Sequence, residues 1–403
     1  MKKFVFILLA LSLCLVSCKK LEQWLGFEKD VIGQNEPSLD SSGEDEKEPE
    51  VEPGDQPESP VETVVSLGEL GRTANCYVVS QEGTYSIPAV KGNSVESVGD
   101  VASAEVLWES FGTDVTPTVG DIIEQVQYEA TTGKIVFSTP VTLKNGNAVI
   151  AAKDASGEIL WSWHIWVCKD FDPEATAQEY YNNAGVMMDR NLGAISATPG
   201  DVGAMGLLYQ WGRKDPFLGS SSISSSIKAA STLSWPSTVS SNPSTGSIDY
   251  AVKHPTTFIM LNSRNYDWYY TNNSSTDNTR WQSAKTIYDP CPPGWRVPGG
   301  DSGIVWIKAM GSGGSFSYTW DSANKGMNFA GKFGSSSTIW CPAMGAVQGG
   351  DGSLYDVSFH GHWWSCSPNG EDAYALSFNY VGYVYPSAYG NRASGCSVRC
   401  QKE

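Results

Sequence analysis

Basic residues, histidines and long apolar runs are all scarce in this chain. Its 403 residues include 27 Lys and Arg against 44 Asp and Glu, for a formal net charge of −17 at pH 7, and only 4 His. Proteins that bind nucleic acid need a basic surface to neutralise phosphates, so this charge balance argues against that function class. Beyond residue 16 no segment approaches the length of a membrane-spanning helix, so we expect no transmembrane helix in the mature protein.

Catalytic and metal-binding motifs are equally scarce. The chain has no His-Glu-x-x-His zinc motif and no Gly-x-Ser-x-Gly nucleophile elbow. His360 and His362 would share one face of a strand, but no third histidine lies near them in sequence to complete a metal site. We therefore expect no metal, no cofactor and no enzymatic activity.

Glycine and aromatic residues are abundant instead. The chain contains 41 Gly, 15 Trp, 18 Tyr and 13 Phe, and 40% of its residues are hydrophobic while 18% are charged. This composition excludes a largely disordered protein and a coiled coil. It is typical of a mainly β protein that works outside the cytoplasm.

Residues 1–18 have the features of a bacterial export signal. Two lysines precede an apolar run over residues 4–16, which is too short to span a bilayer. The run ends in Leu15-Val16-Ser17-Cys18, which resembles the lipobox of bacterial lipoproteins. The resemblance implies that Cys18 carries a lipid and becomes the first residue of the mature protein. Because Lys19 rather than Asp follows it, the sorting rule of that family implies an outer-membrane lipoprotein, which we expect at the cell surface.

Residues 19–62 have the composition of an extended tether. The part from residue 28 to residue 62 holds 13 acidic and 2 basic residues, with Pro, Ser and Gly between them. Such a segment buries too little apolar surface to offset the entropy of ordering, and its like charges and prolines keep it extended. We expect it to hold the folded part of the chain away from the membrane.

Residues 63–169, the first folded segment, contain seven short β-type runs. They are residues 75–80, 83–88, 104–108, 122–128, 134–137, 147–152 and 159–167, with Gly, Asn and Pro between them. Asn145-Gly146 and Ser156-Gly157 are typical of tight hairpin turns. Seven strands in about 105 residues favour a β-sandwich of immunoglobulin type.

Residues 170–403, the second folded segment, carry three blocks that resemble one family. The blocks are Met188-Asp-Arg-Asn-Leu-Gly-Ala with Gly206-Leu-Leu-Tyr-Gln-Trp-Gly-Arg-Lys-Asp-Pro-Phe, then Ile287-Tyr-Asp-Pro-Cys-Pro-Pro-Gly-Trp-Arg-Val-Pro, then Gly395-Cys-Ser-Val-Arg-Cys. Together they resemble the Fibrobacter succinogenes major paralogous domain of Bacteroides-type surface lipoproteins, and they are similar to formylglycine-generating-enzyme-like domains. The resemblance implies a C-type-lectin-like α+β domain with paired terminal strands, short helices and long binding loops.

Seven cysteines follow Cys18, and export favours disulfides. The family resemblance implies a bridge between Cys291 and Cys400, which joins the middle block to the last strand. The next expected pair is Cys366 with Cys396. Cys76 and Cys168 bracket the first folded segment and could pair, which would leave Cys341 alone. The sequence does not settle this connectivity.

Two aromatic groups are the candidate ligand-binding residues. Tyr383, Tyr385 and Tyr389 lie in a stretch broken by Gly and Pro between two β-type runs, so we expect them on an exposed loop. The second group is Trp268, Tyr269 and Tyr270. Aromatic side chains of this kind suit sugar rings or a protein partner, whereas some of them will be core residues.

These observations predict a lipid-anchored binding protein of the cell surface, an adhesin for a glycan or a surface protein. One alternative is a tip or accessory subunit of a lipoprotein-derived pilus. An alternative of another class is a glycan-active or modifying enzyme. Two carboxylates close together in a cleft would favour that alternative. Partners other than the membrane and such a ligand, and the oligomeric state, do not follow from the sequence.

Overall fold

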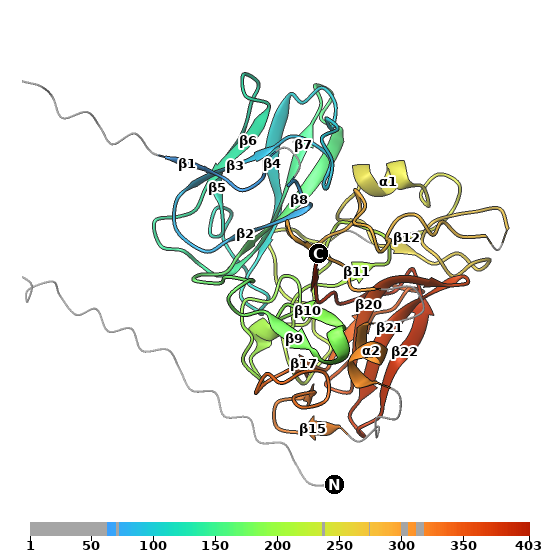
Figure 1. Ribbon diagram of the computed structural model, residues 1–403. Coiled ribbons are helices and arrows are strands. Elements are labelled where there is room, and N and C mark those ends of the chain that lie inside the picture. Colours follow the sequence, from blue (N-terminus) through green and yellow to red (C-terminus); the bar gives the residue numbers. More distant parts are fainter. Residues whose placement is uncertain (1–62, 70–71, 236–237, 274, 300–304, 312–317) are drawn as a thin grey trace, which may run out of the picture. The chain divides into compact units, whose positions relative to one another are not determined.

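The computed structural model describes residues 63–403 except 70–71, 236–237, 274, 300–304 and 312–317 (Figure 1). The chain is mainly β, with several sheets and very little helix. None of the helices in these described ranges is long and apolar enough to cross a membrane. The predicted lipid site at Cys18 and the predicted tether over residues 19–62 lie outside the described residues.

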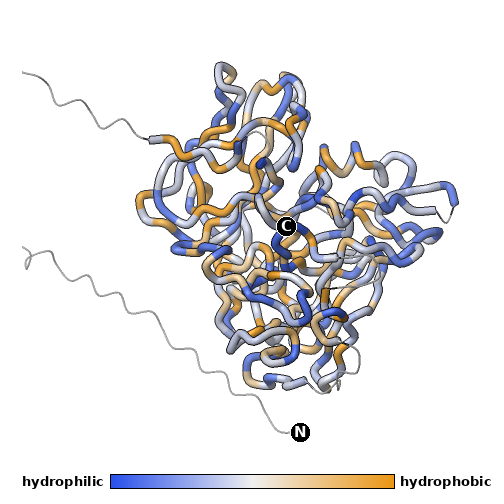
Figure 2. Tube along the Cα trace, viewed as in Figure 1, coloured by the Kyte–Doolittle hydropathy of each residue, from blue (hydrophilic) through white to orange (hydrophobic). Residues whose placement is uncertain are grey.

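The first folded segment forms two four-stranded sheets. One has the order β1-β3-β6-β5 and the other β2-β8-β7-β4. The strands are β1 (Val64–Ser66), β2 (Cys76–Val79), β3 (Thr84–Pro88), β4 (Ser103–Ser110), β5 (Glu124–Glu129), β6 (Lys134–Ser138), β7 (Gly146–Lys153) and β8 (Ile159–Val167). All seven expected strands are present, and β1 is an additional one. Figure 2 shows apolar and polar stretches alternating along the chain, the pattern on which that prediction depends.

Only one of the two expected hairpin turns exists. Ser156 and Gly157 join the antiparallel pair β7 and β8, and Gly157 has a φ of 86° that suits glycine. Asn145 and Gly146 do not form a tight turn, because β6 and β7 belong to different sheets. Gly146 instead begins β7, and its Cα lies close to Ile122 and to the backbone of Ser110. A Cβ at this position would lie 2.3 Å from Ile122 Cδ1 and 2.8 Å from the Ser110 carbonyl oxygen.

The second folded segment contains one large sheet and three small ones. Strands β11 (Tyr209–Gln210), β23 (Gly395–Cys396), β18 (Met344–Val347), β20 (His360–Asn369), β21 (Asp372–Asn379) and β22 (Val384–Asn391) follow one another in the large sheet, and β19 (Leu354–Val357) pairs with β18. The small sheets hold β9 (Gln178–Tyr180), β10 (Gly185–Met187), β14 (Trp295–Arg296) and β24 (Gln401–Lys402); β12 (Val239–Ser240) and β13 (Ile259–Met260); and β15 (Thr319–Asp321), β16 (Gly326–Asn328) and β17 (Trp340–Pro342).

The helices of the described residues are short. They are α1 (Ile248–Lys253), α2 (Val305–Met310) and the 3-10 turns η1 (Tyr181–Asn183) and η2 (Val202–Ala204). The Ser247 hydroxyl accepts a hydrogen bond from the Tyr250 N–H and so caps α1. The early strand β10 pairs with the last strand β24, as Met187 lies opposite Gln401.

One hydrophobic cluster spans the two folded segments, and another lies between the two sheets of the first segment. On β8, Trp161, Trp163 and Ile165 face the core between the two sheets of the first segment. Trp166 lies on the opposite face of the strand and packs with residues of the second segment, and its indole N–H donates to the Ala194 carbonyl at 3.1 Å. The described residues from 63 onward belong to one compact unit. The strands on the two sides of residue 169 belong to different sheets, while one hydrophobic cluster joins them.

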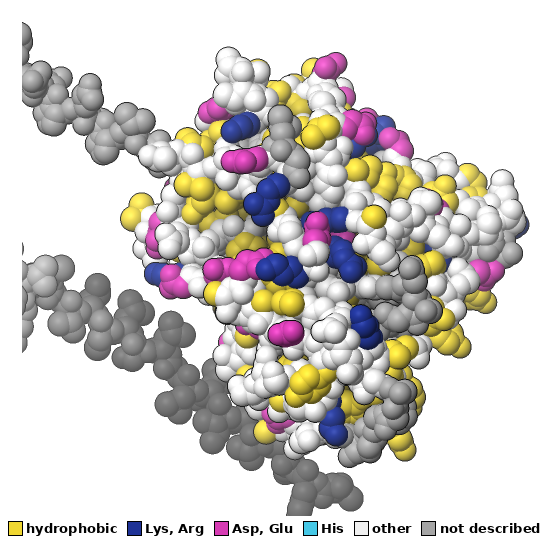
Figure 3. Space-filling model, viewed as in Figure 1, with side chains coloured by type: hydrophobic (Ala, Val, Ile, Leu, Met, Phe, Trp, Pro, Cys, Tyr) yellow, Lys and Arg dark blue, Asp and Glu magenta, His cyan; other side chains and the backbone are white. Residues whose placement is uncertain are grey.

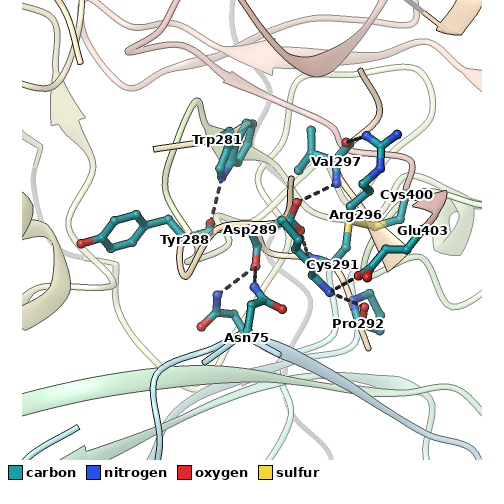
Figure 4. Close-up of a disulfide and its surroundings, with 12 residues drawn as sticks. Asn75, Trp281, Tyr288, Asp289, Cys291, Pro292, Arg296, Val297, Cys400 and Glu403 are labelled. Atoms are coloured by element: carbon teal, nitrogen blue, oxygen red, sulfur yellow. Dashed lines mark hydrogen bonds and ion pairs between the residues drawn. A yellow bond between two sulfur atoms is a disulfide. The ribbon is translucent and has the colours of Figure 1, made fainter. Parts of the chain in front are cut away.

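Cys291 and Cys400 form a disulfide, with their Cα atoms 6.0 Å apart (Figure 4). The expected Cys366–Cys396 bridge is absent, and both residues are free thiols. Trp363 pairs with Ser397 in a parallel bridge, which aligns Cys396 with His362. Cys366 is therefore displaced by four residues, or about 13 Å along the strand, too far for a disulfide.

A displacement of four residues along paired strands also separates Cys76 from Cys168. Strands β2 and β8 are parallel, with Cys76 opposite His164 and Val79 opposite Val167. Cys168 therefore lies about four residues beyond Cys76 along the ladder, and both are buried free thiols. Cys341, the residue expected to be left alone, is also a buried free thiol.

Candidate functional site

The candidate site lies at the end of the large sheet, on strands β20, β21 and β22. Strand β21 pairs with β20 on one side and with β22 on the other, both antiparallel, and β22 is the last strand in the sheet order. His362 lies opposite Ser377, and Ser377 lies opposite Tyr385. Directly opposed residues of an antiparallel pair point to the same side of a sheet, so these three side chains form one row.

A second row continues the same surface. His360 lies opposite Asn379. Asn379 and Tyr383 close the turn, because the Asn379 N–H donates to the Tyr383 carbonyl at 3.0 Å and the Tyr383 N–H donates to Asn379 Oδ1 at 3.1 Å. We call the six residues of the two rows the tyrosine face: His360, His362, Ser377, Asn379, Tyr383 and Tyr385.

The two tyrosines of this face are open to solvent. Tyr383 and Tyr385 are 59% and 52% exposed, and their ring centroids lie 6.3 Å apart with the planes tilted by 33°. Neither ring is covered by the core, so the pair presents a continuous aromatic surface with two hydroxyl groups. Exposed aromatic surface of this kind is characteristic of a binding site.

Tyr389 is also exposed, at 65%, but it points to the other side of the sheet. It lies opposite Tyr374, whereas Ala388 lies opposite Ala375. Between Tyr385 and Ala388 the strand contains one extra residue, a bulge at Pro386 and Ser387. Proline has no N–H for the ladder, which explains why the irregularity occurs there.

The three tyrosines were expected on one loop, and this expectation is wrong in two respects. Tyr385 and Tyr389 belong to β22, and only Tyr383 lies in the connecting turn. Because the bulge changes the alternation, Tyr389 does not share the surface of Tyr383 and Tyr385. The expectation of exposure holds for all three side chains.

In the second aromatic group, Trp268 is a core residue and the two tyrosines are half-buried. Trp268 is fully buried and its indole N–H donates to the Trp211 carbonyl at 2.8 Å. The Arg280 guanidinium lies over its ring, 4.7 Å from the centroid, and is itself buried with Asp267. Tyr269 and Tyr270 are half-buried beside it. Trp268 therefore belongs to the core.

The two histidines add polar groups beside the tyrosines. The imidazoles of His360 and His362 stack with centroids 5.9 Å apart, and His360 Nδ1 lies 3.2 Å from Asp356 Oδ2. Burial, followed by the neighbouring His360, lowers the pKa of His362 from 6.5 to about 4. His362 is therefore neutral at pH 7 and offers one donor and one acceptor.

The face offers groups for stacking and for hydrogen bonding. Its six side chains supply phenol rings, hydroxyls, an amide and imidazoles, and the half-exposed Asp356 carboxylate borders it at His360. Within the residues that the structure describes, no three or more His, Cys, Asp or Glu side chains are grouped to hold a metal ion. Ser377 and Asn379 could not be predicted as part of the site, because only the strand register shows which residues stand beside the tyrosines.

Comparison of the chain with protein-family models, with curated proteins and with solved structures found no match.

Proposed function

We propose that this protein is a lipid-anchored adhesin of the cell surface that binds a glycan on its tyrosine face. The observation that carries the proposal is the exposed pair of rings, Tyr383 and Tyr385, standing in line with Ser377 and His362 across three strands. A sugar combines apolar ring faces with many hydroxyls. Two adjacent rings offer stacking surface, while the serine, asparagine and imidazole groups offer hydrogen bonds.

A surface protein is the other ligand class that an aromatic face can take. We favour a glycan because the side chains beside the two rings carry hydrogen-bonding groups that match sugar hydroxyls. Phe359 and Tyr380, which adjoin His360 and Asn379 in the chain, are exposed and in ring contact, and they offer apolar surface to a protein partner. Binding to a protein is therefore an outcome that the experiment below separates.

The anchoring part of the proposal depends on the sequence alone. Leu15-Val16-Ser17-Cys18 supports acylation of Cys18, and the acidic composition of residues 28–62 supports a tether between the lipid and the folded unit. Together they would hold the tyrosine face clear of the outer membrane.

The topology supports the finer fold proposals for both segments. The match uses β1 as the first strand and leaves out β2, which extends the second sheet next to β8. The orders β1-β3-β6-β5 and β4-β7-β8 are then those of the two sheets of an immunoglobulin-type sandwich, although β1 runs parallel to β3. In the second segment, the pairing of β10 with β24 and the Cys291–Cys400 disulfide support a C-type-lectin-like domain, as the family resemblance implies.

The test is a glycan array probed with the purified full chain in detergent. The parent protein should bind a restricted set of glycans, and Tyr383→Ala/Tyr385→Ala should lose them without a change in melting temperature. Binding to no glycan while the protein still adheres to protease-sensitive receptors on cells would contradict the glycan assignment. Unchanged glycan binding by the double variant would contradict the site.

A further inference from the structure

A polar cleft of about 650 Å³ lies where the two folded segments meet, away from the strands of the tyrosine face. This volume is in the range of small-molecule sites, and junctions between segments are where such sites commonly occur. The first segment contributes Arg72, Thr73, Asn93, Ser94 and Val95, and the second contributes Lys285, Pro293, Gly294 and Glu403.

The walls of the cleft are held in place from both sides. Asn93 Nδ2 donates to the Thr286 carbonyl at 2.6 Å, and Asn75 Nδ2 donates to the carbonyls of Ile287 and Asp289 at 2.7 and 2.8 Å. Figure 4 shows Asn75 reaching Asp289 beside the Cys291–Cys400 disulfide. A site whose shape is fixed before binding loses little entropy when a ligand enters.

One cation of the cleft is almost buried and already holds a carboxylate. The Lys285 side chain is only 9% exposed, and its Nζ donates to the Pro292 carbonyl at 2.7 Å. The same Nζ lies 3.3 Å from Glu403 Oε1, whose side chain is 45% exposed. A buried ammonium needs an anionic partner, and the open position of Glu403 allows a ligand carboxylate to replace it.

The second cation has no partner in the described part of the chain. Arg72 is exposed and lines the cleft, and its guanidinium makes no ion pair or side-chain hydrogen bond with any described residue. A free guanidinium binds a carboxylate through two parallel hydrogen bonds. Figure 3 shows basic and acidic side chains next to each other on the face that carries the C-terminal end of the chain.

The remaining lining suits a hydroxylated ring. The Ser94 hydroxyl accepts from the Glu96 N–H at 2.9 Å, and its own proton has no acceptor among the described residues, so it can donate to a ligand. Val95, which is exposed, and Pro293 supply apolar surface on the two sides. At Gly294 nothing lies within 4 Å of the position of a Cβ, which leaves that wall open.

We propose that this cleft binds a small acidic sugar. The ligand carboxylate lies between Arg72 and Lys285 and displaces Glu403, while the ring stands against Val95 and its hydroxyls bond to Ser94. This site is independent of the tyrosine face and does not depend on the proposed adhesion function.

The test measures binding of sodium glucuronate to the full chain by calorimetry, with glucose and sodium acetate compared at equal ionic strength. Glucuronate should bind more tightly than either. Arg72→Gln should weaken glucuronate binding by roughly tenfold or more, because it removes two charge-assisted hydrogen bonds at an exposed position. Arg264→Gln, at an exposed arginine of the second segment, is the matched control and should bind like the parent.

Several results would overturn the proposal. Absence of glucuronate binding, equal binding of glucose, or full binding by Arg72→Gln would exclude a carboxylate site in the cleft. Acetate that binds as tightly as glucuronate would exclude the sugar. The Tyr383→Ala/Tyr385→Ala variant should keep glucuronate binding, and a loss there would move the ligand to the tyrosine face.

Discussion

Tyr385 and Tyr389 point to opposite faces of the sheet, although only three residues separate them. Tyr385 stands opposite Ser377 and Tyr389 stands opposite Tyr374, and the bulge between them reverses the alternation. The strand therefore carries two exposed tyrosines of similar accessibility in different surroundings. This relationship provides a natural control for any experiment on the tyrosine face.

The cysteine pattern predicts a defined number of free thiols. The structure contains one disulfide, Cys291–Cys400, and five free cysteines among the described residues. Thiol titration of the unfolded, unreduced mature chain should give five thiols per molecule. Three thiols would show a second bridge and contradict the assignment of all five cysteines as free thiols.

Removal of the disulfide should strongly destabilise the protein. The bridge joins residues 109 positions apart, and the chain-entropy model assigns about 4–5 kcal/mol to a loop of this length. Cys291→Ala/Cys400→Ala should therefore lower the urea midpoint sharply. An unchanged midpoint would show that the bridge does not stabilise the folded state.

Buried His164 should make the protein less stable in acid. Burial lowers its pKa from 6.5 to about 3, and its Nε2 lies 2.8 Å from Asn147 Oδ1. Below about pH 6.5 the unfolded chain takes up a proton at this residue while the folded chain does not until about pH 3. The free energy of unfolding is therefore lost as pH falls through this window.

The measurement is urea unfolding at a series of pH values from 7 to 4. His164→Gln removes this proton uptake, so its stability should fall less steeply than that of the parent. His254→Gln, at an exposed histidine of the second segment, is the control and should follow the parent. Equal slopes for the parent and His164→Gln would contradict the role of His164.

The close approach at Gly146 predicts a costly alanine substitution. A Cβ there would lie 2.8 Å from the Ser110 carbonyl oxygen, which cannot move without shifting β4. Gly146→Ala should lower the free energy of unfolding by about 1–3 kcal/mol, the range for overpacking. Gly350→Ala is the control, because its nearest neighbour to a Cβ is a flexible glutamine side chain at 3.9 Å. Equal stability of the two variants would argue against the tight contact.

The strands of the first folded segment could be predicted because each has β-branched or aromatic residues between turn signals. Ile159–Val167 illustrates this, with Trp161 and Trp163 on one face. The opposite face could not be interpreted in the same way. Ser162 and His164 alternate with Trp161 and Trp163 as the polar side of a strand would, yet both are buried.

The exposure of the tyrosines could also be predicted, because turn residues interrupt the stretch that holds them. Their division between two faces could not, since it depends on a single extra residue at Pro386 and Ser387. The prediction of a Cys366–Cys396 disulfide was wrong for a related reason. Pairing depends on strand register, which a list of cysteine positions does not contain.

The most direct test of the account compares single alanine variants at three exposed tyrosines. The dissociation constant of the best array glycan is measured for Tyr383→Ala, Tyr385→Ala and Tyr389→Ala by surface plasmon resonance. Loss of an aromatic contact of about 1–1.5 kcal/mol corresponds to roughly fivefold to tenfold weaker binding. We predict this loss for Tyr383→Ala and Tyr385→Ala and parental affinity for Tyr389→Ala. Equal losses at all three positions, or a loss at Tyr389 alone, would contradict the tyrosine face as the binding site.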